Sequence, residues 1–171
     1  MSLKNNPKLR VYMLSAVLII LIVSGLYIHS QNLPSYPVTI EKFLGKYYTV
    51  STYIDIPNDV NELNELIENY RDCLVEKEIE RFVRNRTILL NSLAAEKEGC
   101  TLKPKKINIT SVNNERQTYR YEITVEVNYA ENEQKDITLT GKVYMEDDSK
   151  YSLISKYYPD GGKQGIFNLL K

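Results

Sequence analysis

Histidine and tryptophan are nearly absent from this chain of 171 residues, which has one histidine and no tryptophan. The histidine, His29, directly follows a long apolar run and lies far in sequence from the strand-like segments near the C-terminus. Catalytic triads and Cys–His pairs need an imidazole beside the nucleophile. The sequence therefore excludes imidazole chemistry from the polar region that follows the run.

Cysteine is also scarce, with only Cys73 and Cys100. They stand 27 positions apart without further Cys or His ligands, which argues against a zinc site. Both fall in segments that look helical, and their spacing leaves a buried thiol and a disulfide equally open. Gly161-Gly162-Lys163 lacks the strand–loop–helix setting of a phosphate-binding loop and is expected to form a turn. We expect no metal and no cofactor.

Charged residues are missing from Val11 to Ile28, a run of eighteen residues. As a helix this run would be about 27 Å long, which matches the hydrocarbon core of a bilayer. A buried core helix usually has a polar stripe, whereas only Ser15, Ser24 and Gly25 interrupt this apolar surface. The run is therefore predicted to cross the lipid bilayer as a transmembrane helix.

The flanks of the run set its orientation. Lys4, Lys8 and Arg10 precede it without an acid, and such a flank stays on the cytoplasmic side. Residues 24–30 offer no small-x-small cleavage site, which favours an uncleaved anchor over a signal peptide. We expect a single-pass protein of the cell membrane with a cytoplasmic tail (1–10), a transmembrane helix (11–28), a Pro-containing neck (29–38) and one extracytoplasmic domain (39–171).

The outer part also lacks an excess of basic charge. All 22 acidic residues and 19 of the 22 basic residues lie beyond residue 30, which leaves a formal charge of −3 there. Nucleic-acid-binding domains usually present a basic face, so no nucleic-acid partner is expected. Four acids near the strand segments fall on polar, alternating positions and are expected to form solvated surface instead of a catalytic pair: Glu122, Glu126, Asp136 and Asp147. We expect a protein that is not an enzyme.

The first half of the outer domain has apolar residues at helical spacing. Thr39 is a candidate N-cap for a first helix over 39–53. Apolar positions recur every three or four residues over 60–74 and predict an amphipathic second helix. Its opposite face carries acidic residues and is expected to be exposed to solvent. A third stretch, over 79–93, forms one bent helix or two, and Gly99 is expected to end it as a C′ glycine.

From residue 105 onward the periodicity changes to two. Over 118–129, apolar residues and tyrosines alternate with polar residues, which is typical of a half-buried antiparallel strand. Short turns separate it from expected strands over 106–112, 137–145 and 151–158. Helices ahead of such strands predict an α+β domain, with the helices covering one face of a curved four-stranded antiparallel sheet. The apolar tail over 166–170 is expected to pack on the sheet or to dock a partner.

Tyrosine is the residue type that stands out, with fourteen copies against three phenylalanines. Its ring buries a large area while its hydroxyl stays polar, which suits either the edge of a core or a protein interface. Both interpretations remain open at this point. The candidate interface residues are Tyr119, Tyr121, Tyr129, Tyr157, Tyr158 and Phe167.

The order of these segments resembles that of the VirB8-like components of bacterial conjugation and type IV secretion, including Gram-positive relatives. The sequence over 43–50 (FLGKYYTV) looks like the opening helix of an NTF2-like domain, and the meander over 119–158 looks like its curved sheet. The resemblance implies a non-enzymatic scaffold that assembles with itself and with other membrane channel subunits. It implies no small-molecule substrate, and it transfers no binding residue.

Two further hypotheses remain. The first is an anchored extracytoplasmic sensor or regulator that binds a signal or another membrane protein, although a ten-residue inner tail leaves little room for an effector. The second is an anchored enzyme or ligand binder that uses a cone-shaped cavity under the sheet. It predicts a deep pocket with converging polar groups.

Overall fold

The computed structural model describes residues 36–52, 57, 59–113, 116–130, 133–147, 152–161 and 165–170. The predicted tail, the predicted membrane-spanning segment and most of the predicted neck lie outside these residues. Among the helices that the structure describes, none is long and apolar enough to span a bilayer. The membrane anchor over 11–28 therefore stays a prediction.

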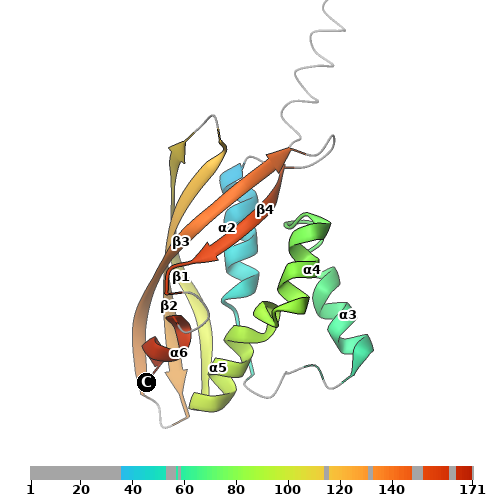
Figure 1. Ribbon diagram of the computed structural model, residues 1–171. Helices are drawn as coiled ribbons and strands as arrows, with labels where there is room; N and C mark the ends of the chain where they lie inside the picture. The colour runs from blue at the N-terminus through green and yellow to red at the C-terminus, as the bar shows by residue number, and fades with distance from the viewer. Residues whose placement is uncertain are drawn as a thin grey trace, which may run out of the picture. The chain divides into compact units, whose positions relative to one another are not determined.

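The domain has a helical first half, as predicted, and its helices are short (Figure 1). The first helix begins at Tyr36, inside the predicted neck, and it ends at Tyr47 because Val50 pairs with a strand. The second helix is capped by Asp59, whose side chain accepts hydrogen bonds from two backbone N–H groups. The helices are α2 (Tyr36–Tyr47), α3 (Val60–Glu68), α4 (Glu76–Arg84), the 3₁₀ turn η2 (Thr87–Leu89), α5 (Leu90–Glu98) and α6 (Gly165–Leu170).

The predicted helix over 60–74 is too long by about a turn and a half. The observed helix ends at Glu68, because the chain must turn so that Leu74 can form a parallel bridge with a strand. The stretch over 79–93 forms separate helices, joined where Arg86 adopts a left-handed φ of 55°. Gly99, with a φ of 63°, ends α5 as predicted.

The second half forms one antiparallel sheet in the order β1–β2–β3–β4, which confirms the predicted meander. The predicted strand over 118–129 matches β2 in full. The first strand begins six residues earlier than expected, so Cys100 lies in β1 and not in a helix. The strands are β1 (Cys100–Asn113), β2 (Thr118–Tyr129), β3 (Gln134–Asp147) and β4 (Ser152–Pro159).

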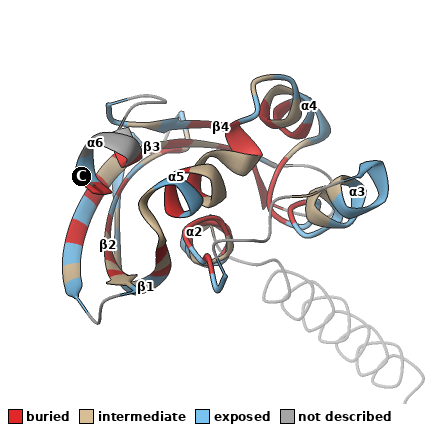
Figure 2. Cartoon of the chain, turned by 90° about the horizontal axis from the view of Figure 1, so that it is seen from below, coloured by how far each residue is buried: buried red, intermediate tan, exposed pale blue. Residues whose placement is uncertain are grey.

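The core lies between the concave face of the sheet and the helices. Figure 2 shows α2 and α5 inside the curve of the sheet, with α3 farther out. Ile40, Phe43 and Leu44 on α2 are completely buried, and each such side chain contributes about 1.5–3 kcal/mol. The alternation in β2 places a buried row opposite them: Tyr121, Ile123, Val125 and Val127. This arrangement confirms the α+β class and is compatible with an NTF2-like fold.

The C-terminal apolar segment packs on the domain. Ile166 and Leu170 of α6 are buried. The hydroxyl of Tyr129 donates to the carbonyl oxygen of Leu170 at 2.6 Å. The first of the two expectations for this segment, packing on the sheet, is therefore confirmed.

Candidate functional site

Aromatic rings fill the space between α2, α4 and β4. Phe43 and Tyr47 are four residues apart on α2, so they share one face of the helix, and their rings stack at 5.5 Å. Tyr157 of β4 meets them edge-on, with ring centroids 5.0 Å from Phe43 and 5.5 Å from Tyr47. Phe82 of α4 closes the cluster at 5.9 Å from Phe43. These offset and edge-to-face contacts are favourable ring geometries. The rings fill the space between the helices and the concave face of the sheet, which we call the cone.

Three tyrosine hydroxyls meet at the centre of this packing. The hydroxyl of Tyr157 lies 2.7 Å from that of Tyr48 and 2.8 Å from that of Tyr121. The third side of the triangle, between Tyr48 and Tyr121, measures 3.4 Å. Because a phenol both donates and accepts, three phenols can satisfy one another without water. We call these three residues the tyrosine triad.

Burial raises the pKa of each hydroxyl in the triad above the ordinary tyrosine value. The low-polarity interior disfavours a phenolate, so all three groups stay neutral at physiological pH. A buried neutral phenol is a poor general base. The arrangement therefore holds the segment after α2 against the sheet through neutral hydroxyl groups.

A glycine on β3 makes room for the triad. A Cβ atom on Gly141 would lie 2.5 Å from the Tyr121 hydroxyl oxygen and 2.5 Å from the Tyr158 carbonyl oxygen. Only a residue without a side chain fits this close approach. Gly141 thus lets the Tyr121 side chain cross the inner face of the sheet.

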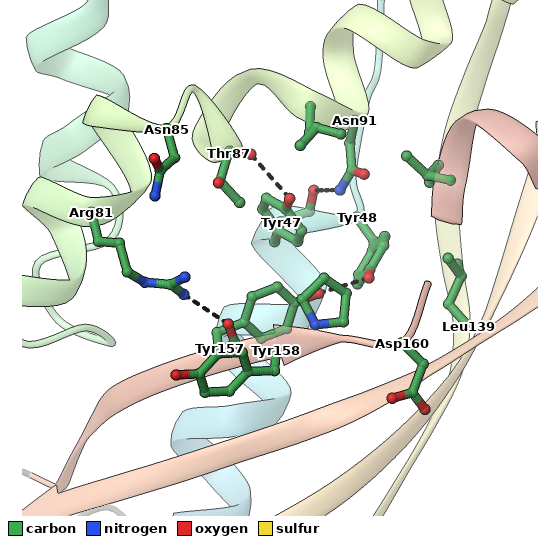
Figure 3. Close-up of a pocket in the computed structure, with 13 residues that line it drawn as sticks. Tyr47, Tyr48, Arg81, Asn85, Thr87, Asn91, Leu139, Tyr157, Tyr158 and Asp160 are labelled. Atoms are coloured by element: carbon green, nitrogen blue, oxygen red, sulfur yellow. Dashed lines mark hydrogen bonds between the residues drawn. The ribbon is translucent and has the colours of Figure 1, made fainter. Parts of the chain in front are cut away.

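An ion pair between a buried carboxylate and a partly exposed arginine joins α4 to β4. Glu78 is only 2% exposed, and its carboxylate accepts two hydrogen bonds from Arg81, at 2.7 and 2.5 Å. Arg81 also donates to the Tyr157 carbonyl oxygen at 2.7 Å, while the Tyr157 N–H donates to Glu78 at 2.8 Å. Glu78 and Arg81 together satisfy the backbone N–H and C=O groups of Tyr157, a residue of the edge strand β4. We call these contacts the α4–β4 clip; Figure 3 shows its Arg81 arm.

A pocket of about 170 Å³ opens beside the triad. Two of its polar groups are bonded within the protein: Asn91 donates to the Tyr47 carbonyl oxygen at 2.6 Å, and the Tyr47 hydroxyl donates to the Thr87 carbonyl oxygen at 3.0 Å (Figure 3). Sites for drug-sized ligands usually measure about 300–1,000 Å³. This recess is mostly apolar and smaller than such sites. Two larger grooves, of about 520 and 490 Å³, lie between α2, α3 and α5 and between α4 and β4.

The two cysteines are free and buried. Burial raises the pKa of Cys73 to about 12, and its thiol donates to the Asp72 carboxylate at 3.1 Å. Burial also raises the pKa of Cys100. Both thiols stay protonated at neutral pH and are weak nucleophiles. Within the described ranges, no three His, Cys, Asp or Glu side chains gather as a metal site would require.

The structure separates the tyrosines that sequence reasoning grouped. Tyr121 and Tyr157 are completely buried, so the interface hypothesis is corrected for these two: they belong to the core, where their hydroxyls bond each other. Tyr119 and Tyr129 are half-buried, and Tyr158 is 47% exposed. The side chain of Phe167 lies outside the described residues, so its assignment stays a prediction.

Sequence reasoning missed the α4–β4 clip. Its only local signal is an acid and an arginine three residues apart on a helix, and surface helices carry this spacing very often. The sequence indicated the setting of two members of the triad, because Tyr48 lies in the segment predicted as a helix and Tyr121 in the segment predicted as a strand. Nothing local indicated that their hydroxyls meet.

Comparison with known proteins adds no family: no protein-family model matches the chain, and no curated protein matches it. Its class therefore follows from the geometry alone. The described residues form an α+β domain whose cone is filled by tyrosine and phenylalanine side chains.

Proposed function

We propose that this chain is a non-enzymatic, membrane-anchored scaffold subunit of a conjugative transfer or type IV secretion channel, which assembles with itself and with other membrane channel subunits. The observation that carries the proposal is the filled cone. The tyrosine triad and the aromatic rings around it occupy the space under the concave face of the sheet, where the ligand-binding hypothesis places a cone-shaped cavity. A domain packed in this way acts through its surface.

The predicted anchor supports the same function. If residues 11–28 cross the membrane, seven residues (29–35) join that segment to the start of α2. Seven extended residues reach at most about 25 Å. The domain is thereby held close to the bilayer, where the other subunits of a channel are found.

The ligand-binding alternative is less well supported. Its signature would be a deep pocket under the sheet with polar groups aimed inward, whereas the recess beside the triad measures about 170 Å³, and Asn91 and the Tyr47 hydroxyl in it bond to backbone carbonyls. The larger grooves, of about 520 and 490 Å³, lie outside the packed aromatic rings. In the sensor alternative, as in the scaffold proposal, the domain binds its partner through its outer surface. It differs in what the gene neighbourhood should contain, namely a sigma factor or a two-component pair in place of a coupling ATPase and a relaxase.

A transfer assay tests the proposal. Deletion of the gene should lower conjugative DNA transfer by several orders of magnitude, and the full chain supplied in trans should restore it. A chain that begins at residue 31 should be produced as a folded domain and fail to restore transfer, because it lacks the anchor. Unchanged transfer in the deletion strain would overturn the proposal.

A further inference from the structure

The groove between α4 and β4 differs from the recess beside the triad in size and in charge. It measures about 490 Å³, which falls inside the usual range for bound ligands, about 300–1,000 Å³. Helix α4 lines one side, and β4 with Glu146 of β3 lines the other. The exposed ring of Tyr158 gives the groove an apolar contact surface, and the guanidinium of Arg81 lies over this ring at 5.4 Å (Figure 3).

Basic side chains form one stripe along the α4 side of this groove. Lys77, Arg81 and Arg84 follow one another at spacings of four and three residues, so they lie on one face of the helix. Lys77 and Arg84 are two turns apart, about 10 Å along the helix axis. Lys156 of β4 adds a cation from the opposite side. We call the groove lined by these four residues the basic groove.

Two acids of the lining are already paired. Glu78 is bonded to Arg81 in the α4–β4 clip. Glu76 accepts a hydrogen bond at 2.5 Å from Arg71, which does not line the groove. These two carboxylates therefore do not neutralise the other cations of the basic groove.

Three cations are left with one acid. Among the described side chains, no carboxylate forms an ion pair with Lys77, Arg84 or Lys156. The remaining acid of the lining is Glu146. The groove thus keeps a formal excess of two positive charges, in an outer part of the chain whose formal charge is −3. A recess lined by one sign of charge concentrates groups of the opposite sign.

The α4–β4 clip determines how a partner can bind here. An edge strand often binds a partner through its free backbone groups. In β4, however, the N–H and C=O groups of Tyr157 are bonded to Glu78 and Arg81, and the backbone of Ile154 is bonded to the turn before α4. Strand addition is blocked at these positions, so a partner must use its side chains. Lysine and arginine are donors, and their strongest partners are anionic oxygens.

We propose that the basic groove binds a short acidic segment of another protein, whose carboxylates pair with Lys77, Arg84 and Lys156. An excess of two positive charges matches a segment with two or three carboxylates. An apolar side chain between those carboxylates can contact the exposed ring of Tyr158. The inference rests on the proposed function and gives the scaffold a specific surface for another subunit.

Other anionic partners fit this groove less well. Nucleic acid needs an extended basic face, whereas Glu146 and the negative charge of the outer part oppose a long row of phosphates. A lipid surface is flat, and the cations here line a recess. A short peptide can enter the recess and carries no more charge than the groove can balance.

Peptide titration of the full chain in mild detergent tests the charge recognition. The probe is a fluorescent synthetic peptide with three glutamates separated by leucine and alanine, and its matched control has glutamines in place of the glutamates. Fluorescence anisotropy should show binding of the acidic peptide, with the glutamine peptide at least about tenfold weaker because each lost ion pair contributes up to a fewfold. Binding should weaken as sodium chloride rises, because salt screens exposed charges.

Substitutions in the groove locate the binding site. Arg84→Gln and Lys156→Gln should each weaken acidic-peptide binding about two- to fivefold, and the double variant about tenfold. Lys103→Gln is the matched control, because it removes an exposed cation at the opposite edge of the sheet and should leave the affinity unchanged. All three positions are exposed, so the fold should be kept, and circular dichroism checks this for each variant.

Crosslinking in the native host identifies what occupies the groove. A photo-crosslinking amino acid at position 77 of the full chain should capture another protein at a stretch that contains two or more acids, as mapped by mass spectrometry. The yield should fall when Arg84→Gln and Lys156→Gln are added. Crosslinks that map only to a second copy of this chain, or to stretches without acids, would overturn the inference.

The titration also gives results that contradict the inference. Equal affinities for the acidic and glutamine peptides, or for the groove variants and the wild type, overturn it, as does a DNA oligonucleotide that binds more tightly than the acidic peptide at the same groove. None of these results bears on DNA transfer by the deletion strain, so the groove can be wrong while the scaffold proposal stands. Unchanged transfer overturns the proposed function even if the peptide binds.

Discussion

At the scale of single residues, burial in this domain is decided by position along the sheet as much as by residue type. Tyr119 and Tyr121 occupy the same face of β2, yet Tyr121 is completely buried and Tyr119 is half-buried beside Tyr36. The alternation in the sequence predicts the face correctly. It cannot report how far the helices extend over that face, so sequence reasoning could not sort core tyrosines from surface tyrosines.

The close approach at Gly141 predicts a clear penalty for a methyl group. Gly141→Ala places its Cβ against a ladder carbonyl oxygen and a buried hydroxyl, and the unfolding free energy should fall by about 1–3 kcal/mol. Gly45→Ala is the matched control, because nothing lies within 4 Å of its Cβ position on α2; it should stabilise the domain by about 0.5–1 kcal/mol. Urea denaturation of both variants measures the difference. Equal stabilities would show that the close approach on β3 does not restrict this position.

The tyrosine triad predicts a cost for removing one hydroxyl. In Tyr157→Phe, the hydroxyls of Tyr48 and Tyr121 lose their best partner and keep only each other at 3.4 Å. Leaving buried polar groups unsatisfied should lower the unfolding free energy by about 1–3 kcal/mol. Tyr158→Phe, at an exposed neighbour, should change it by less than about 0.5 kcal/mol. A Tyr157→Phe protein as stable as the wild type would contradict the mutual bonding of the triad.

At the scale of elements, the types were predictable and the boundaries were not. Periods of 3.6 and 2 predicted the order of helices and strands, and Gly99 predicted a helix end correctly. The ends of α2 and α3 were missed, because Val50 and Leu74 leave the helical path to pair with strands more than fifty residues away. A local pattern carries no record of such a long-range pairing.

One contact between elements predicts a pH dependence. Asp72, in the turn after α3, forms ion pairs with Lys42 and Lys46 of α2 at 2.6 and 2.9 Å. Partial burial alone would raise the pKa of Asp72, but hydrogen bonds from Lys42, Lys46 and Cys73 outweigh it and hold the pKa well below its usual range. A carboxyl whose folded pKa is depressed stabilises the fold above its unfolded pKa, near 4, and loses this effect as the pH falls through the folded value.

Asp72→Asn should therefore lose stability at neutral pH and show a weaker decline than the wild type between about pH 4 and pH 2. Urea denaturation across this range measures the decline. Glu80→Gln, at an exposed acid on the solvent side of α4, is the matched control and should follow the wild type. Parallel declines for Asp72→Asn and the wild type would mean that this contact does not link α2 to the turn.

At the scale of the whole molecule, a predicted anchor is joined to a domain with a filled cone. The anchor is inferred from eighteen uncharged residues and a basic flank. The filled cone is visible only in the structure, since the sequence could not show that aromatic side chains from α2, α4 and β4 occupy it. Together they favour a protein that acts by being held at the membrane and binding other proteins there.

Co-purification of two tagged copies tests self-assembly at the membrane most directly. Both full-length copies, each with a different C-terminal tag, are produced together in the native host, and membranes are solubilised in mild detergent. We expect one tag to retrieve the other from the membrane fraction, and we expect no retrieval when membranes are mixed after separate production. A chain that is found outside the membrane fraction, or that never retrieves its second copy from it, would contradict a self-assembling membrane scaffold.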